Sequence, residues 1–177
     1  VLQVRQKEAG YDISLLGGTK DISAGQLVDR IGVLIGCRFP AGGEMEALAQ
    51  RADAASIPAP VSVDGMDCSF SGAENSLKIS AGEGADAGAI CRAVFGCISG
   101  TLSKMIRAAS KKTGLKDVLL VGGVIQNQMI RDALAEDIQR KAPNIRLRLC
   151  PKELSGDNAA GVAALCRKMY ESRGANP

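Results

Sequence analysis

Two glycine-containing segments have the residue types that can hold a phosphate group or a metal ion. The first, Val121-Gly-Gly-Val-Ile-Gln-Asn127, places Gly122 and Gly123 between an apolar run and an expected helix. Glycine lets backbone N–H groups approach a ligand, and a helix N-terminus favours an anion. The same residues also suit a plain tight turn, so this segment alone leaves both interpretations open.

The second segment, Ser155-Gly-Asp-Asn158, precedes the last expected helix. Ser155 or Asp157 can cap that helix, because either side chain accepts hydrogen bonds from backbone N–H groups. Alternatively, the Asp157 carboxylate points into a cleft and holds a divalent cation. A further acidic residue, Asp29, lies in the middle of an expected helix, where by itself it is a surface charge.

Other catalytic chemistries are excluded by composition. The sequence contains no histidine, which excludes Ser-His-Asp and Cys-His catalysis and imidazole zinc sites, unless another chain supplies the ring. No Cys-x-x-Cys pair occurs, so a zinc ribbon or thioredoxin-like motif is unsupported. We expect buried, reduced thiols at all six cysteines: Cys37, Cys68, Cys91, Cys97, Cys150 and Cys166.

Length and composition indicate one globular domain over residues 1–177. Of the 177 residues, 46% are hydrophobic and 23% are charged, which suits a normal core and excludes disorder. We expect no membrane association and a cytoplasmic location, because no apolar run approaches the roughly 18 residues of a spanning helix and no signal peptide is evident. The start without methionine indicates a piece of a longer protein.

Charge divides the chain into two unequal parts. Residues 1–100 have a balance of −4, whereas residues 101–177 have a balance of +7. The basic part could face nucleic-acid phosphates. Its charges are also interleaved with acids along the expected helices, which is typical of a solvated face.

The elements that must position these residues form an α/β pattern. A hairpin is expected first and a helix next, and residues 37–85 are the least regular part, with one short helix. A long helix runs from Asp86 to Gly114, and a β-α-β-α order follows it. The expected strands and helices are a hairpin over 1–16, helices over 23–36, 44–51 and 86–114, a strand over 117–121 buried on both faces, a helix around 130–138, a half-exposed strand over 145–149, and a final helix with Val162, Leu165, Cys166 and Met169 on one face.

Five segments together resemble one family. In order and spacing they are similar to the C-terminal half of TsaD proteins, the tRNA threonylcarbamoyladenosine transferases once called O-sialoglycoprotein endopeptidases or glycoproteases. The segments are Asp21-Ile-Ser-Ala-Gly-Gln-Leu-Val-Asp29-Arg30, Phe39-Pro-Ala-Gly-Gly43, Cys68-Ser-Phe-Ser-Gly72, Gly122-Gly-Val-Ile-Gln-Asn127 and Ser155-Gly-Asp-Asn-Ala-Ala160.

The resemblance implies a fold and a set of binding residues. The fold is the ribonuclease-H-like half of an actin/Hsp70/sugar-kinase-like (ASKHA) ATPase, a mixed sheet with helices. By motif, Asp29 and Asn127 would contact a bound adenine nucleotide, with Gly42 or, if the loop register shifts, Gly43. The Gly122-Gly123 turn would lie beside the nucleotide. Asp157 would be the carboxylate ligand of a divalent metal, namely iron, zinc or magnesium.

The resemblance also implies a reaction and partners. The family transfers a threonylcarbamoyl group from its adenylate to the tRNA adenosine beside the anticodon, and the metal would polarise the acyl donor. Both the metal and the nucleotide would need the N-terminal half of the same protein, so we expect this chain to be inactive alone. Other expected partners are tRNA, further TsaD-pathway proteins and, through exposed apolar surface, a second copy.

Several residues depart from the family pattern. The usual Gly-Glu is Gly25-Gln26, the usual Leu-Lys is Ala73-Glu74 with reversed charge, and the usual Thr before Asp-Asn is Gly156. The family's His-x-x-x-His metal pair and Ser-Gly-Gly-His-Thr phosphate loop belong to the other half. These departures indicate a divergent paralogue, and the alternative function is a non-catalytic scaffold or regulatory partner that retains the ASKHA fold.

Overall fold

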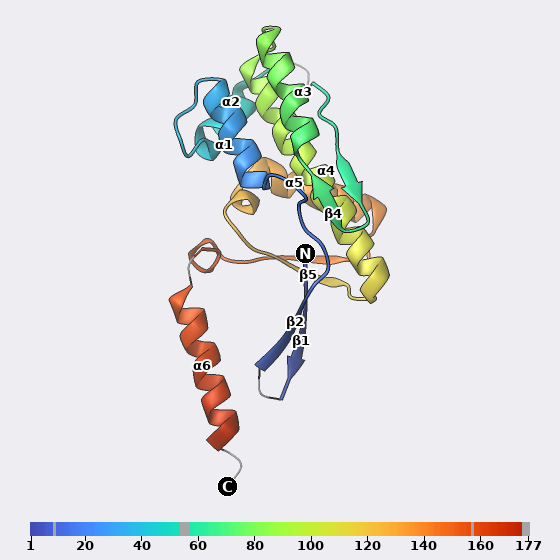
Figure 1. Ribbon diagram of the computed structural model, residues 1–177, viewed down its shortest axis with the longest axis vertical. Coiled ribbons are helices and arrows are strands. Elements are labelled where there is room, and N and C mark those ends of the chain that lie inside the picture. The colour runs from blue at the N-terminus through green and yellow to red at the C-terminus, as the bar shows by residue number, and fades with distance from the viewer. Residues whose placement is uncertain (9, 54–56, 157, 175–177) are drawn as a thin grey trace.

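The computed structural model describes residues 1–8, 10–53, 57–156 and 158–174. These residues form six α-helices, six strands and two short 3-10 helices (Figure 1). In chain order they are β1 (Leu2–Lys7), β2 (Gly10–Leu15), α1 (Ala24–Leu34), α2 (Gly42–Arg51), β3 (Ser62–Asp64), β4 (Asp67–Ser69), α3 (Ser71–Gly82), α4 (Ala87–Thr113), β5 (Asp117–Leu120), η1 (Val124–Gln126), α5 (Gln128–Lys141), β6 (Arg146–Leu149), η2 (Lys152–Leu154) and α6 (Ala159–Gly174).

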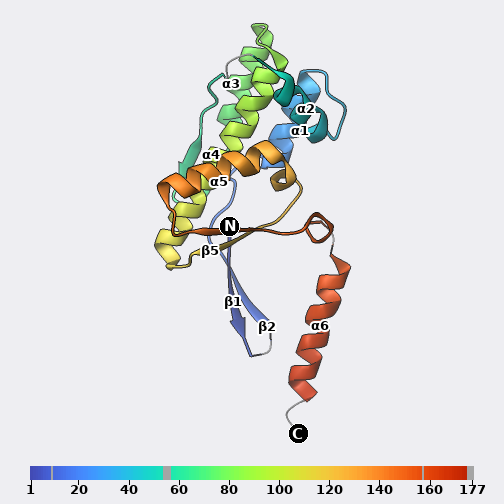
Figure 2. The ribbon, with the colours of Figure 1, turned by 180° about the vertical axis from the view of Figure 1, so that it is seen from behind.

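Helix α4 is the centre of the fold. Helices α1, α2 and α3 pack around its N-terminal part, and α5 crosses it further along (Figures 1 and 2). Phe95, Val94 and Ile98 on α4 are at most 2% exposed, so this helix supplies much of the core. Among the described residues α4 is the one helix long and apolar enough to cross a bilayer, and 72% of its apolar window is buried inside the protein.

The ends of α4 follow from local chemistry. The Asp86 side chain accepts a hydrogen bond from the backbone N–H of Ala89 at 2.8 Å, which caps the first turn. Gly114 ends the helix in the left-handed conformation, with φ of +76°, just after the cations Lys111 and Lys112. The predicted long helix is therefore confirmed.

The strands form three two-stranded sheets. β1 pairs with β2 and β3 pairs with β4, both antiparallel, while β5 and β6 are parallel. The opening hairpin is confirmed, and the alternation in β6 holds in part: Leu147 is partly buried between Arg146 and Arg148, but Leu149 is 40% exposed. The prediction that strand 117–121 is buried on both faces is wrong, because β5 packs one face only and leaves Leu119 63% exposed.

Residues 37–85 are more regular than expected. They contain α2, the β3–β4 hairpin and α3, and α3 was not predicted. Its core-facing apolar residues are few, with Ala73 and Leu77 buried. Serine and glycine fill much of the remaining helix, so its periodicity is weak in the sequence.

Helix α6 lies away from the α1–α5 body, on the same side as the hairpin (Figures 1 and 2). Lys168 Nζ is 5.3 Å from the centre of the Tyr11 ring, which places the helix beside β2. The helix itself is confirmed. Its expected apolar face is not buried, because Val162 is 63% exposed and Cys166 is exposed as well.

Helices α1 and α2 approach closely at Gly32. A Cβ atom at this position would collide with the Cβ of Ala41 and lie 2.8 Å from Met45 Sδ. Ala41 and Met45 are both completely buried. The missing side chain of Gly32 therefore fixes how near the start of α2 lies to α1.

Candidate functional site

A groove of about 660 Å³ lies between α1 and α3. This volume is within the range of small-molecule sites. Its apolar wall includes Val33, Leu34 and Phe39, and charged groups lie along it. The charged and polar residues lining it are Gln26, Asp29, Arg30, Glu74 and Lys78.

Asp29 connects this groove to the Phe39–Gly43 turn. Its Oδ1 accepts a hydrogen bond from the backbone N–H of Ala41 at 2.9 Å. Gly42 is half-buried at the start of α2, and Gly43 is exposed with open space around it. The hydrogen bond from Ala41 holds Asp29 against the residue before Gly42, whereas neither Gly42 nor Gly43 is among the residues that line the groove.

The Gly122–Asn127 turn lies near the start of α1 and beside α2. Gly122 has φ of +116°, a conformation that glycine adopts readily. A Cβ atom on Gly25 of α1 would lie 3.6 Å from Val124 Cγ2, and the Gln128 N–H donates to Glu46 of α2 at 2.6 Å. Gly123 continues the turn in helical backbone geometry.

Asn127, at the end of this turn, caps a helix. Its Oδ1 accepts from the backbone N–H of Ile130 at 3.0 Å and caps α5. This bond occupies one acceptor site, while the side chain also has two N–H donors. Contact between Asn127 and a nucleotide stays a prediction.

The Ser155 segment is tied to the same turn. Gln126 Nε2 donates to Ser155 Oγ at 3.1 Å, which links two segments that the sequence singled out separately. Asn158 caps α6 through a 2.7 Å bond from the Gly161 N–H, and Ser155 instead donates to Cys150 O. Asp157 lies outside the described residues.

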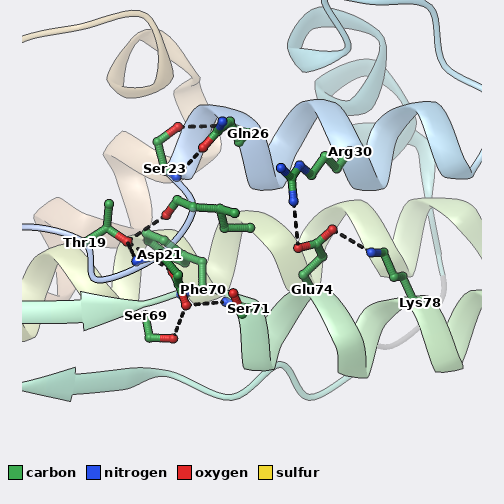
Figure 3. A network of polar contacts seen from close by, with 11 residues as sticks. Thr19, Asp21, Ser23, Gln26, Arg30, Ser69, Phe70, Ser71, Glu74 and Lys78 are labelled. Atoms are coloured by element: carbon green, nitrogen blue, oxygen red, sulfur yellow. Dashed lines mark hydrogen bonds and ion pairs between the residues drawn. The ribbon is translucent and has the colours of Figure 1, made fainter.

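Asp21 carries a hydrogen-bond network that the sequence did not predict (Figure 3). Asp21 and Ser23 both lie just before α1, where an oxygen-bearing side chain can cap the helix. Ser23 takes that role in a capping box with Gln26, whereas Asp21 accepts from the N–H groups of Phe70 and Ser71 at 2.9 and 3.1 Å. The Ser69 hydroxyl donates to it as well. Asp21 therefore ties the start of α1 to the start of α3, the two helices that form the groove.

These bonds also act on the acidity of Asp21. Partial desolvation raises the pKa of its carboxyl, but the hydrogen bonds from Ser69, Phe70 and Ser71 outweigh this effect. The pKa is therefore held well below its ordinary value. The carboxylate stays charged throughout the physiological range.

Glu74 lies in the opposite wall of the groove, between two cations (Figure 3). Its side chain is 6% exposed. Oε1 lies 2.7 Å from Lys78 Nζ, and Oε2 lies 3.4 Å from Arg30 Nη1. The charge that departs from the family pattern is thus buried at the groove.

A metal site is not formed by the described residues. No three His, Cys, Asp or Glu side chains among them cluster closely enough to hold an ion. The described part of the chain therefore does not fit a complete metal centre. Asp157 is the one candidate ligand from the sequence.

Comparison with known proteins places these observations in a family. The family model for TsaD, tRNA N6-adenosine threonylcarbamoyltransferase, matches residues 4–164. A relative with that name from Listeria welshimeri is 34% identical over 166 residues, covering 89% of this chain and 48% of the relative. One from Thermus thermophilus is 31% identical over 160 residues, covering 89% and 47%. The chain spans about half the length of these relatives.

Solved structures share the fold. HypF from T. kodakarensis aligns with a TM-score of 0.64 at 22% identity, covering 84% of this chain and 20% of HypF. The activator of 2-hydroxyisocaproyl-CoA dehydratase from Clostridium difficile, with bound ADPNP, aligns with a TM-score of 0.56 at 17% identity, covering 93% and 54%. These neighbours confirm the predicted ASKHA-type α/β fold. With the family model matching most of its length, the chain belongs to the TsaD family of tRNA N6-adenosine threonylcarbamoyltransferases.

Proposed function

We propose that this chain supplies one wall of an adenine-nucleotide site in a TsaD-type transferase that passes a threonylcarbamoyl group from its adenylate to a tRNA adenosine. One observation carries the proposal most directly. Asp29 lines the 660 Å³ groove and holds the Phe39–Gly43 turn against it. Residues from two family segments therefore meet at one cavity.

The shape and chemistry of the groove support a nucleotide ligand. Val33, Leu34 and the 75% exposed Phe39 offer apolar surface to a flat ring. Asp29 offers a carboxylate that can accept hydrogen bonds from a base or ribose. The structural neighbour from Clostridium difficile holds ADPNP, which is an adenine nucleotide analogue.

In this proposal the chain binds and orients the adenylate. Holding the nucleotide in one position directs the acyl carbon towards the incoming adenosine amine, which lowers the entropic cost of the transfer. The N6 nitrogen then forms a bond to the acyl carbon and releases one proton to solvent, while the bond to the phosphate oxygen breaks and AMP leaves. The glycines at 42, 43, 122 and 123 leave room for close backbone approach.

The remaining parts of the proposal reach beyond this chain. A divalent metal would bind Asp157, with further ligands supplied by a second polypeptide or the N-terminal half of the protein. tRNA, other pathway proteins, a second copy and a cytoplasmic location belong to the same proposal. The relatives from Listeria welshimeri and Thermus thermophilus are named as transferases, so the scaffold alternative is not favoured.

Titration of the isotopically labelled chain with AMP tests the proposal. We expect chemical-shift changes at the amides of Gly42, Gly43 and Asn127, with weak affinity because this chain offers a single wall. A ligand at a concentration equal to its Kd stabilises by only about 0.4 kcal/mol, so the thermal midpoint should scarcely move. No shift in any of these segments at millimolar AMP would refute the proposal.

Asp29→Asn is the matched variant for this titration. Asn keeps an oxygen for the Ala41 N–H, but it loses the charge that strengthens hydrogen bonds to a ligand, so AMP affinity should fall about tenfold. Asp64→Asn is the control, because the Asp64 side chain is 91% exposed and its ion pair is with Lys20 on the surface. Equal affinities for wild type and Asp29→Asn would remove Asp29 from the site.

A further inference from the structure

We infer that Glu74 is a specificity-determining residue of the groove, selecting a nucleoside that presents an N–H or O–H donor to it. This inference rests on the proposed nucleotide site and adds to it the feature of the ligand that is recognised. The observation behind the inference is that the Glu74 carboxylate is buried in the α3 wall of the groove, between the cations Arg30 and Lys78.

The two neighbouring cations do not by themselves account for Glu74. The side chains of Arg30 and Lys78 are 50% and 47% exposed, so water already solvates both. Removing a carboxylate from water carries a desolvation cost of several kcal/mol, whereas a partly exposed ion pair typically returns about 1 kcal/mol or less. An apolar side chain at this position of α3 would avoid that cost, which makes the burial of charge here informative.

Glu74 also has acceptor capacity beyond its two cations. A carboxylate offers about four acceptor positions. The Lys78 ammonium approaches Oε1 at 2.7 Å, while the Arg30 guanidinium approaches Oε2 at 3.4 Å, near the outer limit of a hydrogen bond. Because Oε1 is enclosed by the protein, a donor on a ligand in the groove would bind at Oε2, beside the distant Arg30 guanidinium.

The opposite wall defines which part of a nucleotide can reach Glu74. Val33 and Leu34 on α1 and Phe39 before α2 present apolar surface across the groove from α3. A base lying against that surface presents its polar edge, or the attached ribose, to the α3 wall. The donor that Glu74 reads is accordingly either the exocyclic amine of the base or the ribose 2′-hydroxyl.

A carboxylate here also discriminates against acceptors. A keto oxygen or a phosphate oxygen placed beside Glu74 would face a buried negative charge without a hydrogen bond. Burying two acceptors side by side without a hydrogen bond costs more binding free energy than one favourable hydrogen bond contributes. The groove should therefore reject analogues in which the recognised donor is replaced or removed.

Three nucleotides that share a phosphate separate the two donors. AMP has both groups, purine riboside monophosphate lacks the exocyclic amine without gaining another donor, and 2′-deoxy-AMP lacks the 2′-hydroxyl. Affinities come from the same amide titration used for AMP. The wild-type chain should bind one of the two analogues about tenfold more weakly than AMP, because one hydrogen bond to a charged group is lost.

Two variants test Glu74 itself. Glu74→Gln changes the charge with little change in shape, and Glu74→Leu removes every acceptor. Either variant removes a negative charge and so strengthens the attraction of the groove for the phosphate of all three ligands. The readout is therefore the ratio of affinities rather than a single affinity. We expect the preference for AMP to fall to within about twofold in Glu74→Leu and to an intermediate value in Glu74→Gln, which keeps one neutral acceptor.

Glu83→Gln is the control for charge. Glu83 is exposed at the C-terminal end of the same helix, outside the groove, so this variant should keep the wild-type ratio. Thermal unfolding of each variant establishes that it is folded. Retained discrimination in Glu74→Leu, or no discrimination in wild type, would overturn the inference while leaving the nucleotide site standing. Absence of AMP binding to the wild-type chain would refute both.

Discussion

Replacing Asp21 with alanine should lower the free energy of unfolding by about 3 kcal/mol, since several hydrogen bonds to a carboxylate are lost and two N–H groups at the start of a helix lose their partner. The donors are the N–H groups of Phe70 and Ser71 and the hydroxyl of Ser69. Chemical denaturation of the two proteins at pH 7 measures this difference.

Asp12→Ala is the matched control for Asp21→Ala. Asp12 is also an exposed aspartate, but its ion pair with Lys7 lies at 3.7 Å on the surface of the hairpin. Such a pair contributes at most about 1 kcal/mol. A loss of similar size in both variants would show that Asp21 is an ordinary surface charge.

The contribution of Asp21 should depend on pH in a defined direction. Its folded pKa is lowered relative to an ordinary value of 3.8, so the unfolded chain takes up the proton first as the pH falls. The stabilisation is therefore complete above that value and is lost progressively below it. The difference between wild type and Asp21→Asn should be constant from pH 7 to pH 5 and should shrink by pH 3.

A second large effect is expected at Gly32. Gly32→Ala should lower the free energy of unfolding by about 2 kcal/mol, although alanine is the better helix former, because overpacking a rigid contact costs more than the helix propensity gains. The new methyl would collide with Ala41 Cβ, which is attached directly to the backbone and cannot rotate away. Helix α2 must then move relative to α1.

Gly96→Ala is the matched comparison, and we expect it to stabilise the protein. Gly96 lies within α4, and a Cβ atom there would have nothing within 4 Å. This substitution should raise the free energy of unfolding by about 1 kcal/mol through helix propensity alone. Denaturation curves that show stabilisation by both substitutions would mean that α1 and α2 are not in tight contact at Gly32.

Sequence patterns predicted those elements whose signals are local. The ends of α4 are encoded by Asp86 and Gly114, and the opening hairpin by alternating residues on either side of a turn. Helix α3 lacked such a signal, because its buried residues are only Ala73, Glu74 and Leu77, and a glutamate is expected to face solvent. Burial of that carboxylate depends on α1, which is distant along the chain.

The sequence indicated which residues lie at the candidate site better than it indicated the structural role of each. The resemblance placed Asp29 and either Gly42 or Gly43 in one site, and the structure holds Asp29 against Ala41, the residue before Gly42. It did not indicate that Asn127 caps α5 or that Asp21 spans two helices. Capping by a distant carboxylate leaves no spacing pattern, since the two partners are fixed by tertiary structure alone.

The Asp21 network has a consequence for the order of folding. Asp21 bonds to residues 48 to 50 positions later in the chain. Closing so long a loop is entropically costly, so contacts of this kind usually form after the local helices. Loss of the network by Asp21→Asn should therefore accelerate unfolding and leave the refolding rate nearly unchanged. The lifetime of the folded groove, more than the speed of its formation, is then set by one aspartate.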